Sequence, residues 1–177
     1  MVGECGLPAK QGSRDDFQTP KEALDILIPF IPKQWTIWEP ACGKGNIVNA
    51  LQSKGFNVIG TDVILPVHEG FNDFLTSELN KFECIITNPP YSKKEQFIKR
   101  CYELGKPFAL LMPLTALESE KRQEHWRKGL QLIIPNKRFN FETPSGKGSG
   151  AWFCTAWFTW GLNLPKDLNF VKLNGNN

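Results

Sequence analysis

The chain has 177 residues and a formal net charge of +3, so it is long enough for one domain and only mildly basic. Hydrophobic residues make up 41% and aromatic residues 12% of the sequence, which excludes a disordered chain. The five cysteines are scattered and odd in number, which argues against a zinc site and against a complete disulfide framework. We therefore predict free thiols, no bound metal and, because neither a signal peptide nor a membrane span is evident, a cytoplasmic location.

Composition along the chain predicts one folded domain between two tails. Residues 1–14 are polar and contain several glycines, which is typical of a flexible N-terminal tail. Residues 15–162 are expected to form the folded domain, and residues 163–177 a C-terminal tail. Two helix starts are marked within the domain. Thr19 is expected to cap the first helix, with Pro20 at its first position, and Ser92 to cap a later helix.

Short apolar runs alternate with helical patterns throughout the folded domain. Strands are expected at 35–38, 56–63, 84–87, 108–112, 130–141 and 151–161, with a further short strand between 64 and 82, and a charged helix is expected at 117–128. This alternation predicts an α/β fold with a Rossmann-like, seven-stranded, mostly parallel sheet and helices on both faces. The last two strands are joined by a loop too short for a crossover helix, which predicts an antiparallel C-terminal hairpin.

A glycine-containing loop, residues 39–46, lies between the first strand and the second helix. Glycines at such a position let a bulky ligand approach the backbone. Asp62 follows at the end of the next strand, where a carboxylate can accept the hydroxyls of a ribose. The third glycine of the dinucleotide fingerprint is missing, and Glu39 suits a cationic ligand better than a phosphate. The loop therefore indicates a cofactor other than a dinucleotide, and the alternative is that Glu39 and Asp62 only bridge loops.

A second polar segment, Asn88-Pro89-Pro90-Tyr91, follows the strand at 84–87. The two prolines stiffen the segment because they restrict φ and lack N–H groups. An exocyclic amine of a base is a poor nucleophile, and acceptors for its two hydrogens would help it toward a tetrahedral state. The Asn88 side-chain oxygen and the Pro89 carbonyl are such acceptors, and Tyr91 can stack on a flat base. The alternative is a rigid turn that starts the following helix.

These segments resemble the class I S-adenosylmethionine-dependent amino-methyltransferases and, more narrowly, the small phage-type DNA N6-adenine methyltransferases. The resemblance covers residues 16–161 and rests most specifically on the tetrad at 88–91. It implies S-adenosylmethionine as cofactor, the N6 amine of adenine in DNA as acceptor, and residues 15–162 as the catalytic domain. The cofactor contacts that it implies come from Phe17, Thr19 and Pro20, from Glu39, Pro40, Ala41, Gly43, Gly45 and Asn46, and from Asp62, Asp73 and Phe74.

DNA is expected to bind beside the tetrad, with the target base unpaired or flipped out of the duplex, because a stacked base cannot reach a buried methyl donor. For Phe139 and Phe141, core packing is an equal alternative to stacking on the base. The predicted DNA contacts are Lys93 and Lys94 after the tetrad, Lys137, Arg138, Phe139 and Phe141 near the hairpin, and Lys147 in the glycine-rich loop.

Two other functions remain open at this point. The tetrad also resembles that of RNA methyltransferases and of enzymes that methylate a protein glutamine, so the acceptor can differ while the chemistry stays the same. A non-catalytic relative that binds nucleic acid is the second alternative. The chain is expected to have no room for a separate target-recognition domain, so sequence specificity is expected to be low or to come from short loops or a partner subunit. Whether the chain forms a homo-oligomer is left open.

Overall fold

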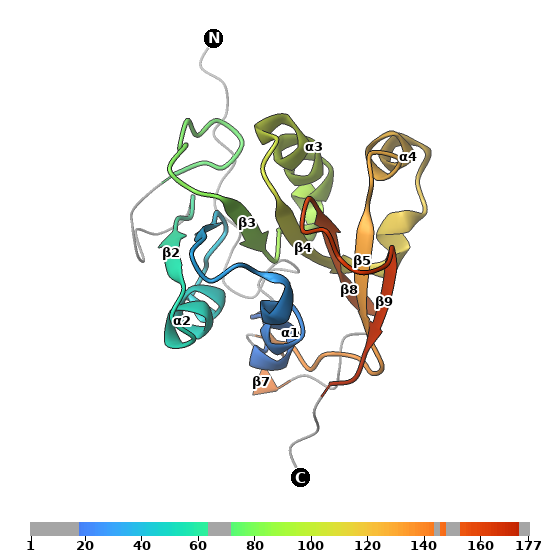
Figure 1. The fold of residues 1–177 in the computed structure, drawn as a ribbon, viewed down its shortest axis with the longest axis horizontal. Helices are drawn as coiled ribbons and strands as arrows, with labels where there is room; N and C mark the ends of the chain where they lie inside the picture. The colour runs from blue at the N-terminus through green and yellow to red at the C-terminus, as the bar shows by residue number, and fades with distance from the viewer. Residues whose placement is uncertain (1–17, 64–71, 144–145, 148–152, 174–177) are drawn as a thin grey trace.

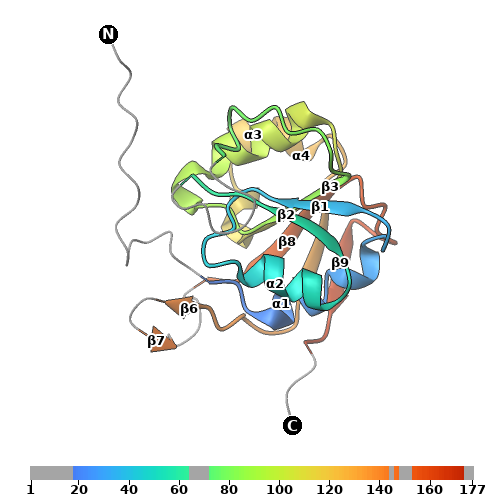
Figure 2. The ribbon, with the colours of Figure 1, turned by 90° about the vertical axis from the view of Figure 1, so that its left-hand side faces the viewer.

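The structure is a computed structural model, and it describes residues 18–63, 72–143, 146–147 and 153–173. Within these residues, seven strands form one sheet with helices on both faces, which confirms the predicted fold class (Figures 1 and 2). In spatial order the strands are β2 (Asn57–Gly60), β1 (Thr36–Glu39), β3 (Cys84–Thr87), β4 (Phe108–Pro113), β8 (Thr155–Trp160), β5 (Gln131–Pro135) and β9 (Leu168–Val171).

The direction of the strands defines the functional edge of this sheet. Each neighbouring pair is parallel except those of β8, which runs antiparallel to both β4 and β5. The predicted antiparallel hairpin is thereby confirmed. Because β8 runs backwards, its first residues lie where the other strands end. We call this side of the sheet, where β1, β3, β4 and β5 end and β8 begins, the carboxyl edge.

Four α-helices among the described residues cover the two faces, as Figure 2 shows. Helices α1 (Lys21–Asp25) and α2 (Asn46–Ser53) pack on one face, and α3 (Lys94–Leu104) and α4 (Glu120–Trp126) on the other. Alternate side chains of β8 pack into the hydrophobic cores on the two faces of the sheet. Trp157 packs toward α1 and Phe158 toward α4. The Trp157 indole donates a hydrogen bond of 2.6 Å to the Ala23 carbonyl of α1, so this strand also anchors the first helix.

The seventh strand is not where the sequence placed it. Residues 72–82 form no strand, and residues 64–71, in the rest of the segment expected to hold one, lie outside the described residues. Instead, β9 forms within the predicted C-terminal tail and pairs in parallel with β5, so the tail assignment for residues 168–171 is wrong. The Asp167 carbonyl accepts a 2.7 Å hydrogen bond from the Leu132 amide, which satisfies one side of β5 that would otherwise be an open edge.

Several element ends also differ from the predictions. Strand β5 ends at Pro135 and not at residue 141, because the chain turns away after the Asn136 amide bonds the Val171 carbonyl. Strand β8 begins at Thr155, and residues 151–152 of the longer predicted strand lie outside the described residues. Helix α4 is shorter than 117–128, since a 3-10 turn at Leu114–Leu117 comes first. A small separate ribbon is formed by β6 (Glu142–Thr143) and β7 (Gly146–Lys147).

The two predicted caps are also wrong. Pro20 and Lys93 occupy the N-cap positions of α1 and α3, and neither helix has a side-chain capping hydrogen bond. A 3-10 turn, Tyr91–Lys93, leads directly into α3 and takes the place of the cap expected from Ser92. The other end of α3 is as expected, because Gly105 closes it in the left-handed conformation with φ of 61°.

In the described part of the chain, no helix combines the length and the apolar character that crossing a membrane requires. The same residues contain no group of three or more His, Cys, Asp or Glu side chains placed to hold a metal ion. Cys42, Cys84 and Cys101 are buried free thiols, and Cys154 is an exposed one.

Candidate active site

Glu39, the last residue of β1, is a fully buried carboxyl at the carboxyl edge. One of its oxygens, Oε1, accepts a hydrogen bond of 3.1 Å from the Ala41 amide. The other, Oε2, has no hydrogen-bond partner in the described structure. Burial raises the pKa of Glu39 to about 8, and the hydrogen bond from the Ala41 amide to Oε1 opposes this rise. A buried carboxyl with an unused acceptor oxygen is suited to a ligand that brings its own positive charge or N–H donors.

Asp62 holds the glycine loop from the next strand. Its Oδ2 atom accepts a 2.8 Å hydrogen bond from the Gly43 amide, and its side chain is buried. Gly43 adopts φ of +49°, a left-handed conformation that favours glycine, and this turns its amide toward Asp62. Burial, with the nearby charges of Glu39 and Asp62, raises the pKa of the Cys42 thiol to about 12. The two carboxyl groups therefore lie close to one thiol that stays neutral.

The segment before α1 lies against the same loop. The Gln18 side chain is close to Gly43, because a Cβ atom added to that glycine would lie 3.8 Å from Gln18 Nε2. Thr19 is buried and Pro20 is half-buried at the start of α1, whereas Phe17 lies outside the described residues. Gln18 was not among the predicted cofactor residues. Its position between Phe17 and Thr19, both predicted cofactor residues, was the signal that could have identified it.

The remaining predicted cofactor residues differ in how far they are buried. Pro40 and Gly45 are buried, Ala41 and Asn46 are half-buried, and Gly43 is exposed. The Asp62 carbonyl accepts a 3.1 Å hydrogen bond from the Asn72 amide, which brings the Asp73 segment to the site. Asp73 accepts a hydrogen bond from the Leu75 amide, and its side chain is half-buried.

Phe74 belongs to the hydrophobic core, so its predicted contact with a cofactor is not available in this structure. Its side chain is only 1% exposed. The ring lies between Trp38 and Phe97, with centroid distances of 5.1 and 4.7 Å. The Phe74 ring packs in the core beneath α3, where it contacts Phe97.

The tetrad follows β3 and reaches the same edge. Strands β1 and β3 are paired. Glu39 ends β1 and Asn88 follows β3, so the two residues lie at the same end of adjacent strands. Pro89 is buried, and the Pro90 carbonyl accepts a 2.9 Å hydrogen bond from the Lys93 amide, which forms the 3-10 turn. All described peptide bonds are trans. The segment is therefore a stiff turn that leaves β3 beside the glycine loop.

Tyr91 is in contact with an aromatic residue that was not predicted to belong to the site. Its ring centroid lies 5.7 Å from that of Phe153, at an interplanar angle of 68°. Phe153 comes two residues before β8, and the reversed direction of that strand is what carries it to the carboxyl edge. Alternation from Trp157 back to Phe153 could have indicated its face but not its proximity to Tyr91.

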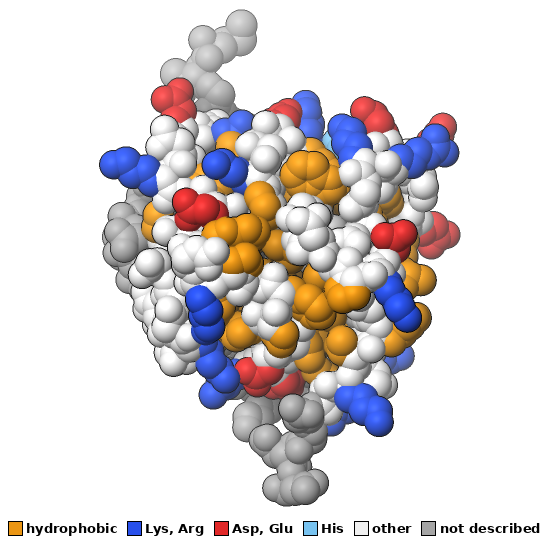
Figure 3. All heavy atoms as spheres, in the orientation of Figure 1, with side chains coloured by type: hydrophobic (Ala, Val, Ile, Leu, Met, Phe, Trp, Pro, Cys, Tyr) orange, Lys and Arg blue, Asp and Glu red, His pale blue; other side chains and the backbone are white. Residues whose placement is uncertain are grey.

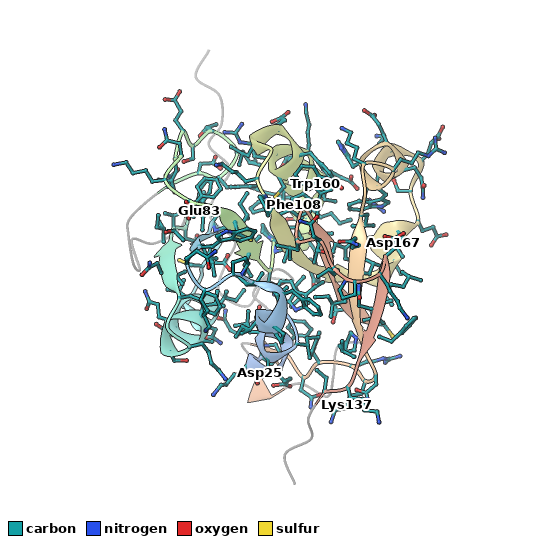
Figure 4. The ribbon with its side chains drawn as sticks, in the orientation of Figure 1. Asp25, Glu83, Phe108, Lys137, Trp160 and Asp167 are labelled. Carbon is teal, nitrogen blue, oxygen red and sulfur yellow. The ribbon has the colours of Figure 1, made fainter. Side chains whose placement is uncertain are left out.

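The predicted DNA contacts are partly corrected. Phe139 and Phe141 are 0% and 3% exposed and belong to the core under α1 and α2, so the packing alternative is right and base stacking is wrong. Lys93, Lys137 and Arg138 are exposed, and Figure 4 shows Lys137 beyond the end of β5. Lys94 is half-buried, with its amine 3.4 Å from the Tyr91 carbonyl. The side chain of Lys147 is not among those that the structure describes.

Arg122 of α4 is a buried cation that ties together the elements after the tetrad. Its guanidinium donates to the Ala116 carbonyl at 2.6 Å and to the Glu118 carbonyl at 2.9 Å, and it pairs with Glu95 in the first turn of α3. The sequence predicts only a charged helix at 117–128 and gives Arg122 no separate role. Its neighbours Lys121 and Arg127 are exposed, so nothing in the sequence distinguishes Arg122 from them.

No protein-family model matches the sequence, and no curated protein matches it either. Among solved structures, the chain is similar to a TehB-like S-adenosylmethionine-dependent methyltransferase from Corynebacterium glutamicum, with a TM-score of 0.52 and 14% identity over 80% of this chain and 87% of that one. It is also similar to a dimethyladenosine transferase from Plasmodium falciparum, with a TM-score of 0.55 and 14% identity over 81% and 61% of the two chains.

A third similar structure is described as a modification subunit of a type I restriction enzyme from Vibrio vulnificus. Its TM-score is 0.54, and 12% of residues are identical over 93% of this chain and 48% of that one. Together with the strand order above, these similarities show that the chain has the Rossmann-like fold of the S-adenosylmethionine-dependent methyltransferases.

Proposed function

We propose that this protein transfers the methyl group of S-adenosylmethionine to the N6 amine of adenine in DNA. The observation that carries the proposal is the adjacency of two loops at the carboxyl edge. The Glu39 loop follows β1, and the tetrad at 88–91 follows β3, the strand paired with β1. In open α/β sheets, ligands bind outside the carboxyl ends of the strands, so a cofactor on one loop would meet an acceptor on the other.

The cofactor would be held mainly by the two buried carboxyl groups. The Oε2 atom of Glu39 lacks a partner and is placed to accept from the ammonium group of the methionine part. Asp62, oriented by the Gly43 amide, would accept ribose hydroxyls. When bound, the cofactor supplies an electrophilic methyl group on a sulfonium.

The acceptor amine would be held by the tetrad. The Asn88 side-chain oxygen and the Pro89 carbonyl would accept its two hydrogens, and Tyr91, supported by Phe153, would stack on the base. These acceptors would hold the amine nitrogen toward the methyl group that the bound cofactor supplies, and the amine would lose one proton to solvent. Asn88 is neutral, so its role is to position and polarise the amine and not to act as a strong base.

The assignment of DNA adenine as the acceptor has its own support, separate from that for the methyl-transfer chemistry. It is supported by the resemblance of residues 16–161 to phage-type adenine methyltransferases, and by the exposed Lys93, Lys137 and Arg138 around the edge. The names of two structural neighbours point the same way, one to an adenosine acceptor and one to a restriction-modification enzyme. The adenosine name also fits RNA, which is therefore the second candidate acceptor.

The test compares the wild-type chain with Asn88→Ala using methyl-labelled cofactor and equal amounts of DNA, RNA and a glutamine peptide. We expect label in adenine of DNA, a loss of about 100- to 1000-fold in turnover for Asn88→Ala, and unchanged cofactor affinity by calorimetry. Asn80→Ala, an exposed position before β3, is the matched control and should keep full activity.

Three outcomes would contradict parts of the proposal. Full methylation by Asn88→Ala would overturn the mechanism. Label in RNA or peptide alone would overturn the acceptor while leaving the chemistry in place. Cofactor binding without product on any of the three acceptors would favour the non-catalytic alternative.

A further inference from the structure

Strand β9 presents two large hydrophobic side chains to solvent at the outer edge of the sheet. The described residues include three exposed large hydrophobic side chains, and two of them are Leu168 and Phe170, which are 50% and 76% exposed. Alternate residues of a strand share a face, so these two lie together, whereas Asn169 and Val171 are half-buried on the other face. An exposed apolar pair on an edge strand marks a surface for another chain.

The backbone of β9 is also available on its outer side. The Asp167 carbonyl accepts a 2.7 Å hydrogen bond from Leu132 of β5, and the Val171 carbonyl a 2.9 Å one from Asn136, the residue after β5. In a parallel ladder, alternate residues direct both backbone polar groups to the same neighbour. The N–H and C=O groups of Leu168 and Phe170 are therefore directed outward, and within the described residues β9 is paired with β5 alone.

We propose that β9 binds β9 of a second copy of this chain in an antiparallel pair, about a two-fold axis at Asn169. In this register Leu168 lies opposite the partner's Phe170, and Phe170 lies opposite the partner's Leu168. Both are hydrogen-bonded pairs of an antiparallel ladder, because their backbone groups are the outward-directed ones. A two-fold contact requires a surface complementary to itself, and this strand meets that requirement in its backbone and its side chains.

Neighbouring registers are less complementary. An axis at Leu168 would place Phe170 opposite the partner's Lys166, and an axis at Phe170 would place Leu168 opposite the partner's Lys172. Only the axis at Asn169 buries both apolar side chains against apolar ones. Figure 3 shows further hydrophobic surface between α1 and β9, with lysine or arginine side chains around it, which the pairing would partly cover.

The flanking lysines set the strength of this contact. In the proposed register, exposed Lys166 lies opposite the partner's Lys172, and like charges oppose each other at both ends of the pair. The contact is short and carries this repulsion, so the dimer should be weak and should tighten as salt screens the lysines. Replacing Lys166 by Glu turns each end into an opposite-charge pair and should tighten the dimer at low salt.

The arrangement has a consequence for the sites, and it holds whether or not the proposed methyl transfer is right. Antiparallel pairing about this axis points the carboxyl edges of the two copies in opposite directions. Figure 4 shows the two ends of the strand region involved, with Asp167 at the start of β9 and Lys137 where β5 ends. The two sites would therefore lie on opposite edges of one continuous sheet and act independently.

Sedimentation velocity of the full chain tests the pairing. We expect a species of twice the 20.1 kDa chain mass to appear as concentration rises, more readily at high salt. Leu168→Lys with Phe170→Lys should raise the dimer dissociation constant about tenfold or more, and Lys166→Glu should lower it several-fold. A chain that stays monomeric up to about 1 mM would overturn the proposal.

Disulfide trapping tests the register independently, in a background with Cys5→Ser and Cys154→Ser. Asn169 would face itself across the axis in a non-hydrogen-bonded pair, with Cα atoms about 4.5 Å apart, which suits a disulfide. Asn169→Cys should cross-link under mild oxidation. Lys166→Cys is the matched control, because the two copies of this residue would lie about 20 Å apart.

Two results would assign the face differently. Equal cross-linking of both cysteine variants would contradict the register and the axis. A chain that remains monomeric, and in which Lys166→Glu weakens binding of a single-stranded oligonucleotide, would make β9 a nucleic-acid surface and overturn the dimer. Circular dichroism of each variant should match the wild type, since Lys166, Leu168 and Phe170 are exposed and Asn169 belongs to neither core.

Discussion

The two halves of the carboxyl edge are constructed differently. The cofactor half comprises Gln18, the loop at 39–46 and Asp62, and main-chain N–H groups hold both of its carboxyl groups. The acceptor half comprises the tetrad at 88–91 and Phe153. Its aromatic pair joins residues far apart in the chain, and the buried guanidinium of Arg122 holds the first turn of the helix behind it.

This difference separates two kinds of sensitivity. The cofactor half is formed by Gln18 and by the segments that follow the adjacent strands β1 and β2, and two carboxyl side chains supply its charge. The acceptor half depends on packing, because the elements that support it come from β8, α4 and the segment after β5. Changes in the supports should therefore lower stability and acceptor use, whereas changes in the cofactor half should alter cofactor affinity and its pH dependence.

The largest expected effect is in the core under α1 and α2, against which Phe153 of the acceptor half packs. Phe139→Ala removes a fully buried ring and should lower the free energy of unfolding by about 3–5 kcal/mol, measured by urea titration. Phe170→Ala, at a concentration low enough to keep the chain monomeric, is the exposed control and should change stability by less than about 0.5 kcal/mol. Unchanged stability in Phe139→Ala, with a raised KM for DNA, would restore the base-stacking interpretation.

Arg122→Met should have the next largest effect. The substitution removes the Arg122 donors to the Ala116 and Glu118 carbonyls, although Ala116 keeps the Trp126 indole at 3.3 Å, and should lower the free energy of unfolding by about 2 kcal/mol. Because Arg122 also holds Glu95 at the start of α3, kcat should fall more than cofactor affinity does. Arg127→Met is the exposed control on the same helix. Equal stability of the two variants would remove Arg122 from the support of the acceptor half.

In the cofactor half, the affinity for the cofactor should depend on pH. The pKa of Glu39 is raised to about 8, so its carboxyl is mostly neutral below that pH, and a cationic ligand needs it ionised. Cofactor affinity should rise with pH by up to about tenfold per unit between about pH 5.5 and 7.5, measured by calorimetry. Glu39→Gln should bind more weakly at pH 7.5 and lose this dependence. The same slope in Glu39→Gln would assign the titration to another group.

The smallest effect concerns the aromatic contact of the acceptor half. Tyr91→Ala should raise the KM for the nucleic acid about fivefold, because base–aromatic stacking contributes about 1 kcal/mol at the lower end of its range. Tyr91→Phe keeps the ring and should stay within about twofold of the wild type. Steady-state rates at saturating cofactor distinguish the two. Equal KM values for both variants and the wild type would place the base elsewhere.

The sequence pattern was sufficient to locate a strand where an unbroken run of buried residues marked it. The strands β1, β3 and β4 were found because each is a continuous apolar run buried on both faces. The positions of Glu39 and Asn88 at strand ends followed from those runs. Strand β9 was missed because it has exposed apolar residues alternating with half-buried ones, and this pattern does not distinguish an edge strand from a tail.

The sequence by itself determined the α/β class, the places of β1, β3 and β4 along the chain and the two polar loops at strand ends, because each depends on neighbours in the chain. Only the tertiary structure decided which aromatic residues are core and which face the site. Phe74, Phe139 and Phe153 are chemically identical, and their burial or contact with Tyr91 depends on strands and helices far away in sequence. The same holds for Arg122 and for the edge position of β9, since side-chain environment and strand pairing arise from contacts between distant segments.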